Sequence, residues 1–259
     1  MGGLQMLAVE RRTKIHQMVE KNGSVESSEL IKIFEVTGET LRKDLMKLES
    51  DGLLRRTHGG AISVKKSVPM KKLESRMDDC RSQKQALSRI ACNYINEGDI
   101  IIVDTGSTAY EFSKTLAGRF ESLTIITASN DVFANLSGIN GMNMVMLGGF
   151  FHRDENAFYG DLTLDALRNL HANKAFIFPS AVSLENGITD YNYDLTLVQK
   201  AMLKAADKIF VLADSNKFEK NAMLKISDIT AGMTFITDPG LDDDIFELYK
   251  KEKIAVDRG

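Results

Sequence analysis

The sequence predicts an α/β protein in which a small winged helix-turn-helix domain precedes a larger domain with a parallel sheet. Residues 10–62 contain three helical patterns of apolar residues followed by a hairpin pattern. From residue 100 onward, continuous apolar runs alternate with helical segments. Between these parts, residues 63–84 are rich in charged residues and Ser, contain Pro69 and show no sustained apolar period. We therefore expect a winged helix-turn-helix domain at 1–62, a linker at 63–84 and an α/β domain at 85–259.

The composition is that of an ordinary globular protein, with 43% hydrophobic and 27% charged residues among 259. The net charge of -3 excludes a polycation, so any nucleic-acid surface has to be a local patch. Cys80 and Cys92 form neither a C-x-x-C pair nor a disulfide framework, which fits a reducing compartment. No apolar stretch approaches the ~18 residues of a membrane span. The sequence therefore predicts a cytoplasmic protein that has no membrane partner.

The first domain is expected to open with two helices. Ile15, Met18 and Val19 recur at helical spacing, and the pattern stops at Gly23. A second helix is expected to begin near Ser27 and to bury Leu30, Ile31 and Phe34.

The third helix is the most informative element of this domain. Thr37 is a plausible N-cap, because its hydroxyl accepts a backbone N–H of the first turn. Leu41, Leu45 and Leu48 follow at i, i+4 and i+7 and predict a buried face, and Gly52 ends the helix.

A hairpin follows this helix. Residues 53–58 read as a strand, Gly59 and Gly60 as a turn, and residues 61–64 as a returning strand. Helix, helix, turn, helix and hairpin together are the outline of a winged helix-turn-helix.

The outer face of the third helix is basic and polar. If the leucines point inward, helical geometry turns Glu39, Lys43, Met46 and Lys47 outward. Residues 38–72 hold nine Lys and Arg against four Asp and Glu, which is the local patch that the net charge concealed. Such a helix fits the DNA major groove, with the hairpin reaching phosphates or the minor groove. The candidate DNA-binding residues are Thr37, Thr40, Arg42, Lys43, Lys47, Arg55, Arg56 and His58.

A blander interpretation stays open for each charged residue alone. Glu39 and Lys43 form an i, i+4 pair that supports any exposed helix, and a basic hairpin can simply be solvated. The DNA-binding interpretation depends on the charges falling together on one short helix and the adjacent hairpin.

The second domain is expected to begin with a long helix around Leu87, which stops at Gly98. Six short apolar runs separated by helical segments follow, and they predict a parallel sheet covered on both faces. These runs are 100–104, 123–127, 144–147, 174–178, 208–214 and 233–237.

The loops that follow these strands are rich in Gly, Ser, Thr and Asp. In parallel sheets, ligands bind at the C-terminal ends of the strands, and small polar residues at a helix N-terminus offer donors to an anion. Each loop alone fits an ordinary helix cap, and several at one edge favour a site for a phosphorylated small molecule. The candidate residues are Asp104, Gly106, Ser107, Thr108, Thr127, Ser129, Asn130, Gly148, Gly149 and Lys217.

The segments V36-T37-G38-E39-T40-L41-R42-K43-D44-L45 and G52-L53-L54-R55-R56-T57-H58-G59-G60-A61 closely resemble the N-terminal signature of the DeoR family of bacterial transcriptional regulators. The 104–108 loop, the L147-G148-G149 turn and the A213-D214-S215-N216-K217-F218 segment resemble the sensor domain of the same family. The resemblance implies a fold related to ribose-5-phosphate isomerase and a response to phosphorylated sugars. It predicts a repressor of sugar metabolism genes that binds an operator in double-stranded DNA.

This chain departs from the family pattern in a few places. The family usually has Ser at position 37 and a larger residue at 38, and Thr37 keeps the cap chemistry. Family members often carry Glu near 195 and Lys near 199, where this chain has Leu195 and Gln199. The resemblance makes Asp190 or Asp194 a replacement carboxylate, and Asp194 is included among the candidate effector-binding residues.

An enzyme is the alternative function. A sugar-phosphate isomerase needs a carboxylate base, for which Asp104, Asp190 and Asp194 are candidates. A basic recognition helix gives an isomerase no advantage, so we expect a regulator that has no catalytic residues. The four histidines lack metal-ligand spacing, and no nucleotide-binding motif is present, so no metal or cofactor is implied. Because one recognition helix contacts few bases, we expect a homo-oligomer that binds paired half-sites.

Overall fold

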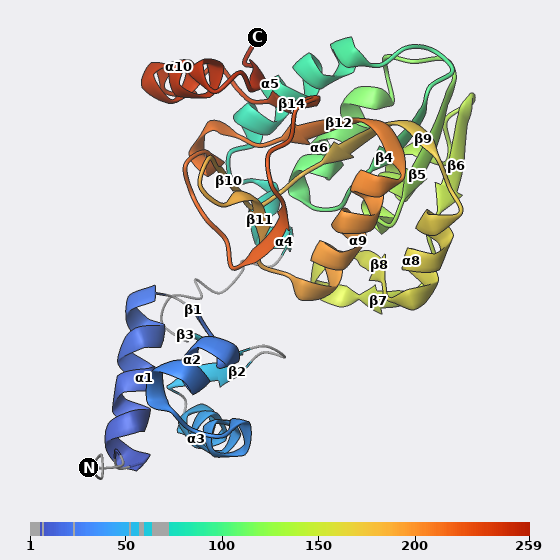
Figure 1. The fold of residues 1–259 in the computed structure, drawn as a ribbon. Helices are drawn as coiled ribbons and strands as arrows, with labels where there is room; N and C mark the ends of the chain where they lie inside the picture. The colour runs from blue at the N-terminus through green and yellow to red at the C-terminus, as the bar shows by residue number, and fades with distance from the viewer. Residues whose placement is uncertain (1–5, 7, 23, 52, 57–59, 64–72) are drawn as a thin grey trace. The chain divides into compact units, whose positions relative to one another are not determined.

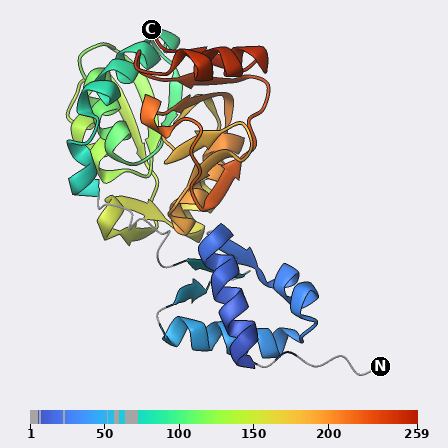
Figure 2. The same cartoon turned by 90° about the vertical axis from the view of Figure 1, so that its left-hand side faces the viewer.

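The computed structural model describes residues 6, 8–22, 24–51, 53–56, 60–63 and 73–259. The chain divides into two compact units, Met1–Met70 and Lys71–Gly259. Figure 1 and Figure 2 show each unit from two directions. The first unit holds three helices and a small antiparallel sheet, and the second holds a parallel sheet with helices on both faces. The predicted fold class is therefore confirmed.

The first unit is a winged helix-turn-helix. Its apolar helix faces meet in one core around Ile15, Leu30, Leu41 and Leu54. The sheet has the strand order β1-β3-β2 and is antiparallel throughout. The elements are α1 (Ala8–Asn22), β1 (Ser24–Glu26), α2 (Ser27–Phe34), α3 (Gly38–Ser50), β2 (Leu54–Arg56) and β3 (Gly60–Ser63).

Gly60 lies in strand β3, where the sequence predicted a turn. It is paired with Glu26 of β1, a strand that the sequence analysis did not predict. A Cβ atom at position 60 would lie 1.9 Å from the carbonyl oxygen of Val25. Only glycine permits this approach of the two backbones, which explains why the residue stands in a strand.

The second unit has a seven-stranded parallel sheet in the order β15-β14-β12-β9-β4-β5-β6. The strands are β4 (Ile100–Val103), β5 (Leu123–Thr127), β6 (Met142–Met146), β9 (Ala172–Ile177), β12 (Ala206–Leu212), β14 (Met233–Ile236) and β15 (Ala255–Asp257). The six predicted apolar runs are all strands of this sheet, whereas β15 was not predicted. Its main helices are α5 (Arg81–Ala91), α6 (Ser107–Leu116), α7 (Asn130–Leu136), α8 (Asp161–Arg168), α9 (Tyr193–Lys204) and α10 (Asp243–Lys251).

Two smaller antiparallel sheets complete the unit. A hairpin joins β7 (Phe150–His152) to β8 (Ala157–Tyr159). The other sheet has the order β10-β11-β13, with β10 (Ala181–Ser183), β11 (Gly187–Asp190) and β13 (Leu224–Ser227).

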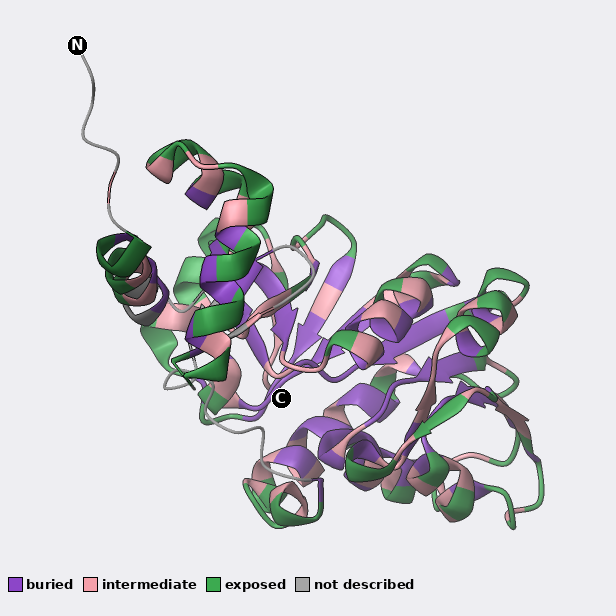
Figure 3. Ribbon diagram, turned by 90° about the horizontal axis from the view of Figure 1, so that it is seen from below, coloured by how far each residue is buried: buried purple, intermediate pink, exposed green. Residues whose placement is uncertain are grey.

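Helices cover both faces of the parallel sheet, as the continuous apolar strands predicted. Ile101 and Val103 of β4 pack with α5, α6 and α7, and Ile102 packs with α8 and α9. Figure 1 shows α6 and α9 on opposite sides of the sheet, and Figure 3 shows the strands buried between their helices. Among the described residues, no helix is both long and apolar enough to cross a bilayer.

Part of the segment predicted as a linker is structured. Helix α4 (Leu73–Met77) and the first residues of α5 belong to the second unit, and Leu73 and Lys84 are both buried. Residues 64–72 lie outside the described residues. The sequence predicted a linker from the charge of this segment, whereas Leu73 and Lys84 are buried in the second unit.

Candidate functional site

Helix α3 has the two faces that the sequence predicted. Leu41, Leu45 and Leu48 are buried, and the exposed residues include Glu39, Arg42, Lys43, Met46 and Lys47. The Thr37 hydroxyl accepts a hydrogen bond from the Thr40 backbone N–H at 3.3 Å, so the predicted N-cap is present. Thr40 lies half-buried in the first turn.

The exposed cations of α3 are paired with acids of the same helix or its end. Glu39 lies 3.4 Å from Arg42 and 3.9 Å from Lys43, and Lys47 contacts Asp51 at 2.8 Å. Exposed pairs of this kind stabilise a protein little, so these cations can exchange their acidic partners for other anions at small cost.

Asp44 is the acidic residue of α3 that faces inward. Its carboxylate accepts a hydrogen bond from Arg11 Nε of α1 at 2.6 Å, and both side chains are buried. The pair ties α1 to α3 and keeps the negative charge of Asp44 off the exposed face of α3. Spacing within α3 could not predict it, because its partner lies 33 positions away.

The hairpin supplies Arg56 at the end of β2. Its backbone N–H and its Nε donate to the two carboxylate oxygens of Glu49 in α3, at 2.8 and 2.7 Å. Arg56 is therefore held against the end of α3. Arg55 lies in β2, although its side chain is not described, and His58 lies outside the described residues.

In the second unit, the direction of chain winding reverses between β4 and β9. Strands β5 and β6 follow on one side of β4, and β9, β12, β14 and β15 lie on the other. Ligands of parallel α/β sheets bind beyond the C-terminal ends of the strands at such a point. The residues there are Asp104 to Thr108 after β4 and Phe178 to Ser180 after β9.

The loop after β4 ends in an open helix N-terminus. Gly106 has φ 105° and precedes α6, and among the described residues no side chain caps the first N–H groups of that helix. Ser107 and Thr108 are buried in its first turn. Uncapped N–H groups at a helix start favour an anion.

Basic side chains surround this loop. A Cβ built on Gly106 would lie 4.0 Å from a terminal guanidinium nitrogen of Arg76 in α4. Lys217, after β12, donates to the Pro179 carbonyl at 2.8 Å and lies 3.9 Å from Asp214. The charges of Arg76 and Lys217 both act on Lys84, so the three cations share one region.

The buried Lys84 holds α4 in place. Its ammonium donates to the Arg76 carbonyl at 2.5 Å and to the Asp79 carbonyl at 2.6 Å. Burial lowers the pKa of Lys84, and the neighbouring Lys217 lowers it further. Arg76 forms an ion pair with Glu155, and burial raises the pKa of Glu155 while Arg76 opposes that rise. Sequence reasoning missed these three residues, because an isolated charge in a charged segment carries no signature.

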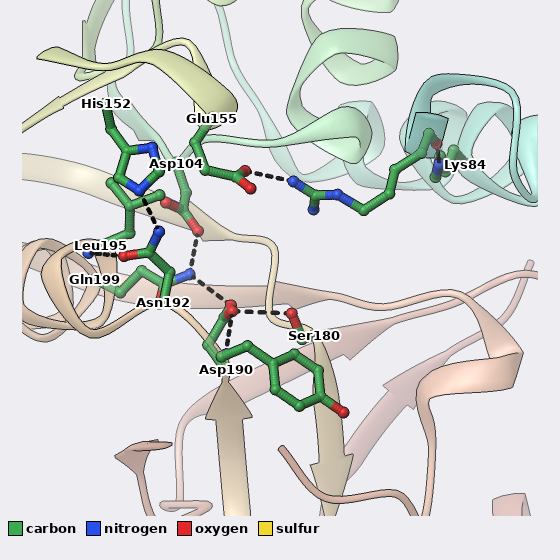
Figure 4. Close-up of polar contacts among 11 residues, drawn as sticks. Lys84, Asp104, His152, Glu155, Ser180, Asp190, Asn192, Leu195 and Gln199 are labelled. Atoms are coloured by element: carbon green, nitrogen blue, oxygen red, sulfur yellow. Dashed lines mark hydrogen bonds and ion pairs between the residues drawn. The ribbon is translucent and has the colours of Figure 1, made fainter. Parts of the chain in front are cut away.

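Carboxylates lie at the other side of the same loop (Figure 4). Asp104 accepts from the Phe178 backbone N–H at 3.0 Å and from Gln199 Nε2 at 2.9 Å. The same Gln199 nitrogen donates to Asp190 at 3.3 Å. Burial raises the pKa of Asp104 to about 7, against the opposing effect of its hydrogen bonds to Gln199 and Phe178.

The other predicted effector residues lie at neighbouring strand ends, and several serve local structure. Thr127 accepts from the Ser129 N–H at 3.0 Å, and Ser129 caps α7 through Val132 N–H at 3.2 Å. The Asn130 side chain donates to Asn156 at 3.2 Å. These contacts account for the three polar residues at and just after the end of β5 without a ligand.

The Gly148-Gly149 turn packs against α8. The Gly148 carbonyl accepts from the Thr163 hydroxyl at 2.7 Å, and a Cβ on Gly149 would lie 2.3 Å from that hydroxyl. Asp194 is half-buried in the first turn of α9. Within the described part of the chain, no hydrogen bond joins it to Asp104 or Asp190.

Both parts of the chain are similar to known protein domains. Residues 11–67 match the DeoR-like helix-turn-helix domain, and residues 79–239 match the DeoR C terminal sensor domain. The chain belongs to the DeoR family. The resemblance predicted from the sequence is therefore confirmed, and the described α3 face and strand-end loops lie within the two matched regions.

Relatives of this DeoR-family protein match along most of their length. It is 33% identical over 251 residues to the uncharacterized HTH-type transcriptional regulator YulB of Bacillus subtilis (strain 168), covering 97% of this chain and 96% of that one. It is 29% identical to the putative aga operon transcriptional repressor of Escherichia coli O157:H7, covering 95% and 92%. The ribose 5-phosphate isomerase A of Methanocaldococcus jannaschii aligns with a TM-score of 0.41 and 17% identity, covering 54% and 55%.

The two residues near the start of α9 that depart from the family pattern, Leu195 and Gln199, are both buried. Leu195 is buried in the first turn of α9, where its N–H donates to the cap Asn192 at 3.2 Å. Gln199 follows one turn later and is the residue between Asp104 and Asp190. In this DeoR-family chain, the candidate sensor site therefore joins two buried carboxylates through a neutral amide.

Proposed function

We propose that the protein is a DNA-binding transcriptional repressor of sugar metabolism genes, which a phosphorylated sugar releases from its operator. Membership of the DeoR family makes it a transcriptional regulator of the helix-turn-helix type. The repressor sign follows the similar protein named as the aga operon repressor. The observation that carries the sensor half is the uncapped start of α6 beside Arg76, with Lys217 at the Pro179 carbonyl of the neighbouring strand end.

At the DNA end, α3 enters the major groove with its capped N-terminus foremost. Arg42, Lys43 and Lys47 then exchange their acidic partners for base edges and phosphates. Arg56 stays bound to Glu49 and presents its remaining guanidinium nitrogens to the phosphates of the DNA backbone. Two such units on paired half-sites give the specificity that one helix lacks, so the working form is a homo-oligomer.

At the sensor end, the phosphate group of the effector lies at the first turn of α6. Backbone N–H groups after Gly106 and the hydroxyls of Ser107 and Thr108 donate to it. Arg76 and Lys217 supply positive charge, which favours a dianionic group over a neutral one.

Arg76 gives the effector a route to the rest of the chain. A phosphate beside Gly106 competes with Glu155 for the Arg76 guanidinium. Because Arg76 belongs to α4, which begins at Leu73, a change of its partner moves the segment nearest to the unit boundary. The effector changes DNA affinity only as far as it binds the two arrangements unequally.

The experiment combines a ligand screen with a DNA-binding assay. A panel of sugar phosphates is tested for thermal stabilisation of the full chain, because a ligand of the folded state raises its melting temperature. Each stabilising compound is then added to the protein bound to a fluorescent duplex from its own upstream region. We expect release of the duplex. Stabilisation without release would contradict the coupling, and no binding to any upstream duplex at low salt would contradict the DNA-binding assignment.

We further propose that sensing involves no turnover. The alternative, an isomerase that uses Asp104 or Asp190 as its base, requires product formation from a stabilising sugar phosphate. Incubation of each stabilising compound with the protein, followed by chromatographic separation, decides between them. Conversion that disappears in an Asp104→Asn variant would favour the enzyme.

A further inference from the structure

The acidic side of the sensor site lacks a cationic partner. Asp104 and Asp190 are 1% and 7% exposed, and among the described residues neither forms an ion pair within 4.0 Å. Their shared partner is Gln199 Nε2, at 2.9 Å and 3.3 Å, and an amide carries no charge. Burial of two carboxylates beside each other is unfavourable unless a cation or a proton compensates their charge.

Gln199 contributes a further acceptor at the same place. Its amide nitrogen is engaged by the two carboxylates, whereas its Oε1 is buried and has no donor among the described residues. Gln199 as a whole is 3% exposed. Figure 4 shows Asp104, Gln199 and Asp190 directed toward one another. The group that completes this cluster therefore has to donate hydrogen bonds rather than accept them.

The acidic and basic sides belong to one site. Lys217 donates to the carbonyl of Pro179, and the hydroxyl of the next residue, Ser180, donates to Asp190 at 2.9 Å. Asp104 lies two positions before Gly106, beside which Arg76 lies. A ligand whose phosphate meets Lys217 and Arg76 thus has its other end near Asp104 and Asp190.

We propose that the effector is a phosphorylated sugar that carries a free, protonated amine. The inference rests on the proposed function and specifies its ligand. The ammonium lies between Asp104 and Asp190 and donates its three hydrogens to these two carboxylates and to Gln199 Oε1. A hydroxyl offers one donor and no charge, and an acetylated amine offers one donor and more bulk.

The protonation state of Asp104 provides a second test of whether an ammonium binds beside it. Burial raises the pKa of this carboxyl to about 7, so a substantial fraction is protonated at neutral pH. An ammonium beside the carboxylate lowers that pKa and releases the proton. Binding of the amino sugar phosphate therefore liberates protons, which calorimetry in buffers of different ionisation enthalpy measures.

The test compares ligands that differ at one substituent. Glucosamine 6-phosphate and galactosamine 6-phosphate are titrated calorimetrically into the full chain, alongside their 2-hydroxyl and N-acetyl counterparts. We expect at least one of the two amino sugar phosphates to bind at least about tenfold more tightly than its 2-hydroxyl and N-acetyl counterparts. A hydroxyl or N-acetyl compound that binds equally well overturns the amine assignment and leaves the proposed function standing. If none of the six compounds binds while the phosphate of another sugar without an amine does, the amine assignment again fails. If no sugar phosphate binds, the proposed function fails as well.

Two variants locate the ammonium. Gln199→Lys places an ammonium of the protein between the carboxylates, and we expect it to abolish the preference for the amine. Asp190→Asn removes one charge and is expected to reduce the preference, whereas Asp207→Asn, at an exposed carboxylate, leaves it unchanged. If Asp190→Asn does not fold, Gln199→Lys alone decides. A preference that survives in a folded Gln199→Lys protein overturns the placement.

Discussion

Single residues in this protein carry charge whose effect depends on burial. Lys43 on α3 is exposed and pairs loosely with Glu39, whereas Asp104 is almost completely enclosed. Exposed pairs contribute about 0–1 kcal/mol, and a buried carboxyl without a cation shifts its pKa instead. Substitution of the first therefore tests function with little effect on folding, and substitution of the second tests both.

Lys43→Ala is expected to weaken binding to the specific duplex by about 1–3 kcal/mol, because one base or phosphate contact is lost. The free energy of unfolding should change by less than about 0.5 kcal/mol. Fluorescence anisotropy with specific and scrambled duplexes measures the first, and urea unfolding measures the second. Lys14→Ala, an exposed lysine of α1, is the control with the same charge change. Equal affinity of the two variants would remove the α3 face from the DNA interface.

Asp104→Asn tests the buried carboxyl through pH. In the folded protein its pKa is raised to about 7, so between about pH 4 and about pH 7 the folded chain holds a proton that the unfolded chain has lost. This group therefore makes the free energy of unfolding fall as pH rises through that window, by up to about 1.4 kcal/mol per pH unit. The Asn variant should lack this component, as the difference from wild type in urea unfolding at several pH values shows.

Asp207→Asn is the matched control for that series, since Asp207 is exposed and pairs with His171. Because this exposed pair contributes little to stability, the variant should follow the wild-type pH profile between about pH 4 and about pH 7. Parallel profiles for the Asp104→Asn variant and wild type would mean that Asp104 titrates normally.

At the scale of helices and strands, the sequence pattern predicted the elements whose formation depends on residues within one short segment. The six apolar runs became strands because a β-branched run buried on both faces favours only a central parallel strand. β1 and β15 have three residues each and no apolar period, and they become strands because β3 and β14 offer a free edge. Such partners lie far along the chain, so a sequence window contains no sign of them.

In the candidate site, too, sequence predicted the features that lie within one segment and missed those formed by distant residues. The loop 104–108 was predicted, because strand ends and small polar residues coincide in sequence. Arg76 was not predicted, because its partner Glu155 lies 79 positions away and α4 lies within a segment of high charge. The pairing of Asp104 with Asp190 through Gln199 likewise depends on three elements that meet only in the folded protein.

Gly60→Ala tests how far the wing depends on the approach of β1 to β3. The added Cβ would lie 1.9 Å from the Val25 carbonyl oxygen and 3.0 Å from the Glu26 Cα, both of which belong to the backbone. The strands therefore have to separate, and we expect the first unit to lose about 2–4 kcal/mol of stability. Hydrogen exchange should rise across α1–β3 and stay unchanged in the parallel sheet.

The control for this substitution is Gly118→Ala, because a Cβ at that position meets nothing within 4 Å. It should alter neither hydrogen exchange nor DNA binding. Unchanged exchange in the Gly60→Ala protein would show that β1 does not pair with β3 in solution.

In the whole molecule, the proposed function couples two binding events, DNA at the first compact unit and effector at the second. Linkage requires reciprocity, so the factor by which effector weakens DNA binding equals the factor by which DNA weakens effector binding. Coupling of typical size, about 1–3 kcal/mol, gives a change of about 5- to 150-fold in both. Both factors are measurable on one sample, by anisotropy at saturating effector and by calorimetry at saturating duplex.

Arg76→Ala is expected to reduce this coupling factor toward one in both directions. In the proposed mechanism the Arg76 guanidinium pairs with Glu155 in the free protein and with the phosphate in the complex. Removal of the guanidinium removes this exchange of partners. Effector affinity should fall as a phosphate contact is lost, whereas DNA affinity without effector should stay near wild type. Arg168→Ala, which removes an exposed arginine paired within α8, is the control and should keep full coupling. If Arg76→Ala binds effector more weakly and yet releases DNA by the wild-type factor at saturation, the signal travels through another element than α4.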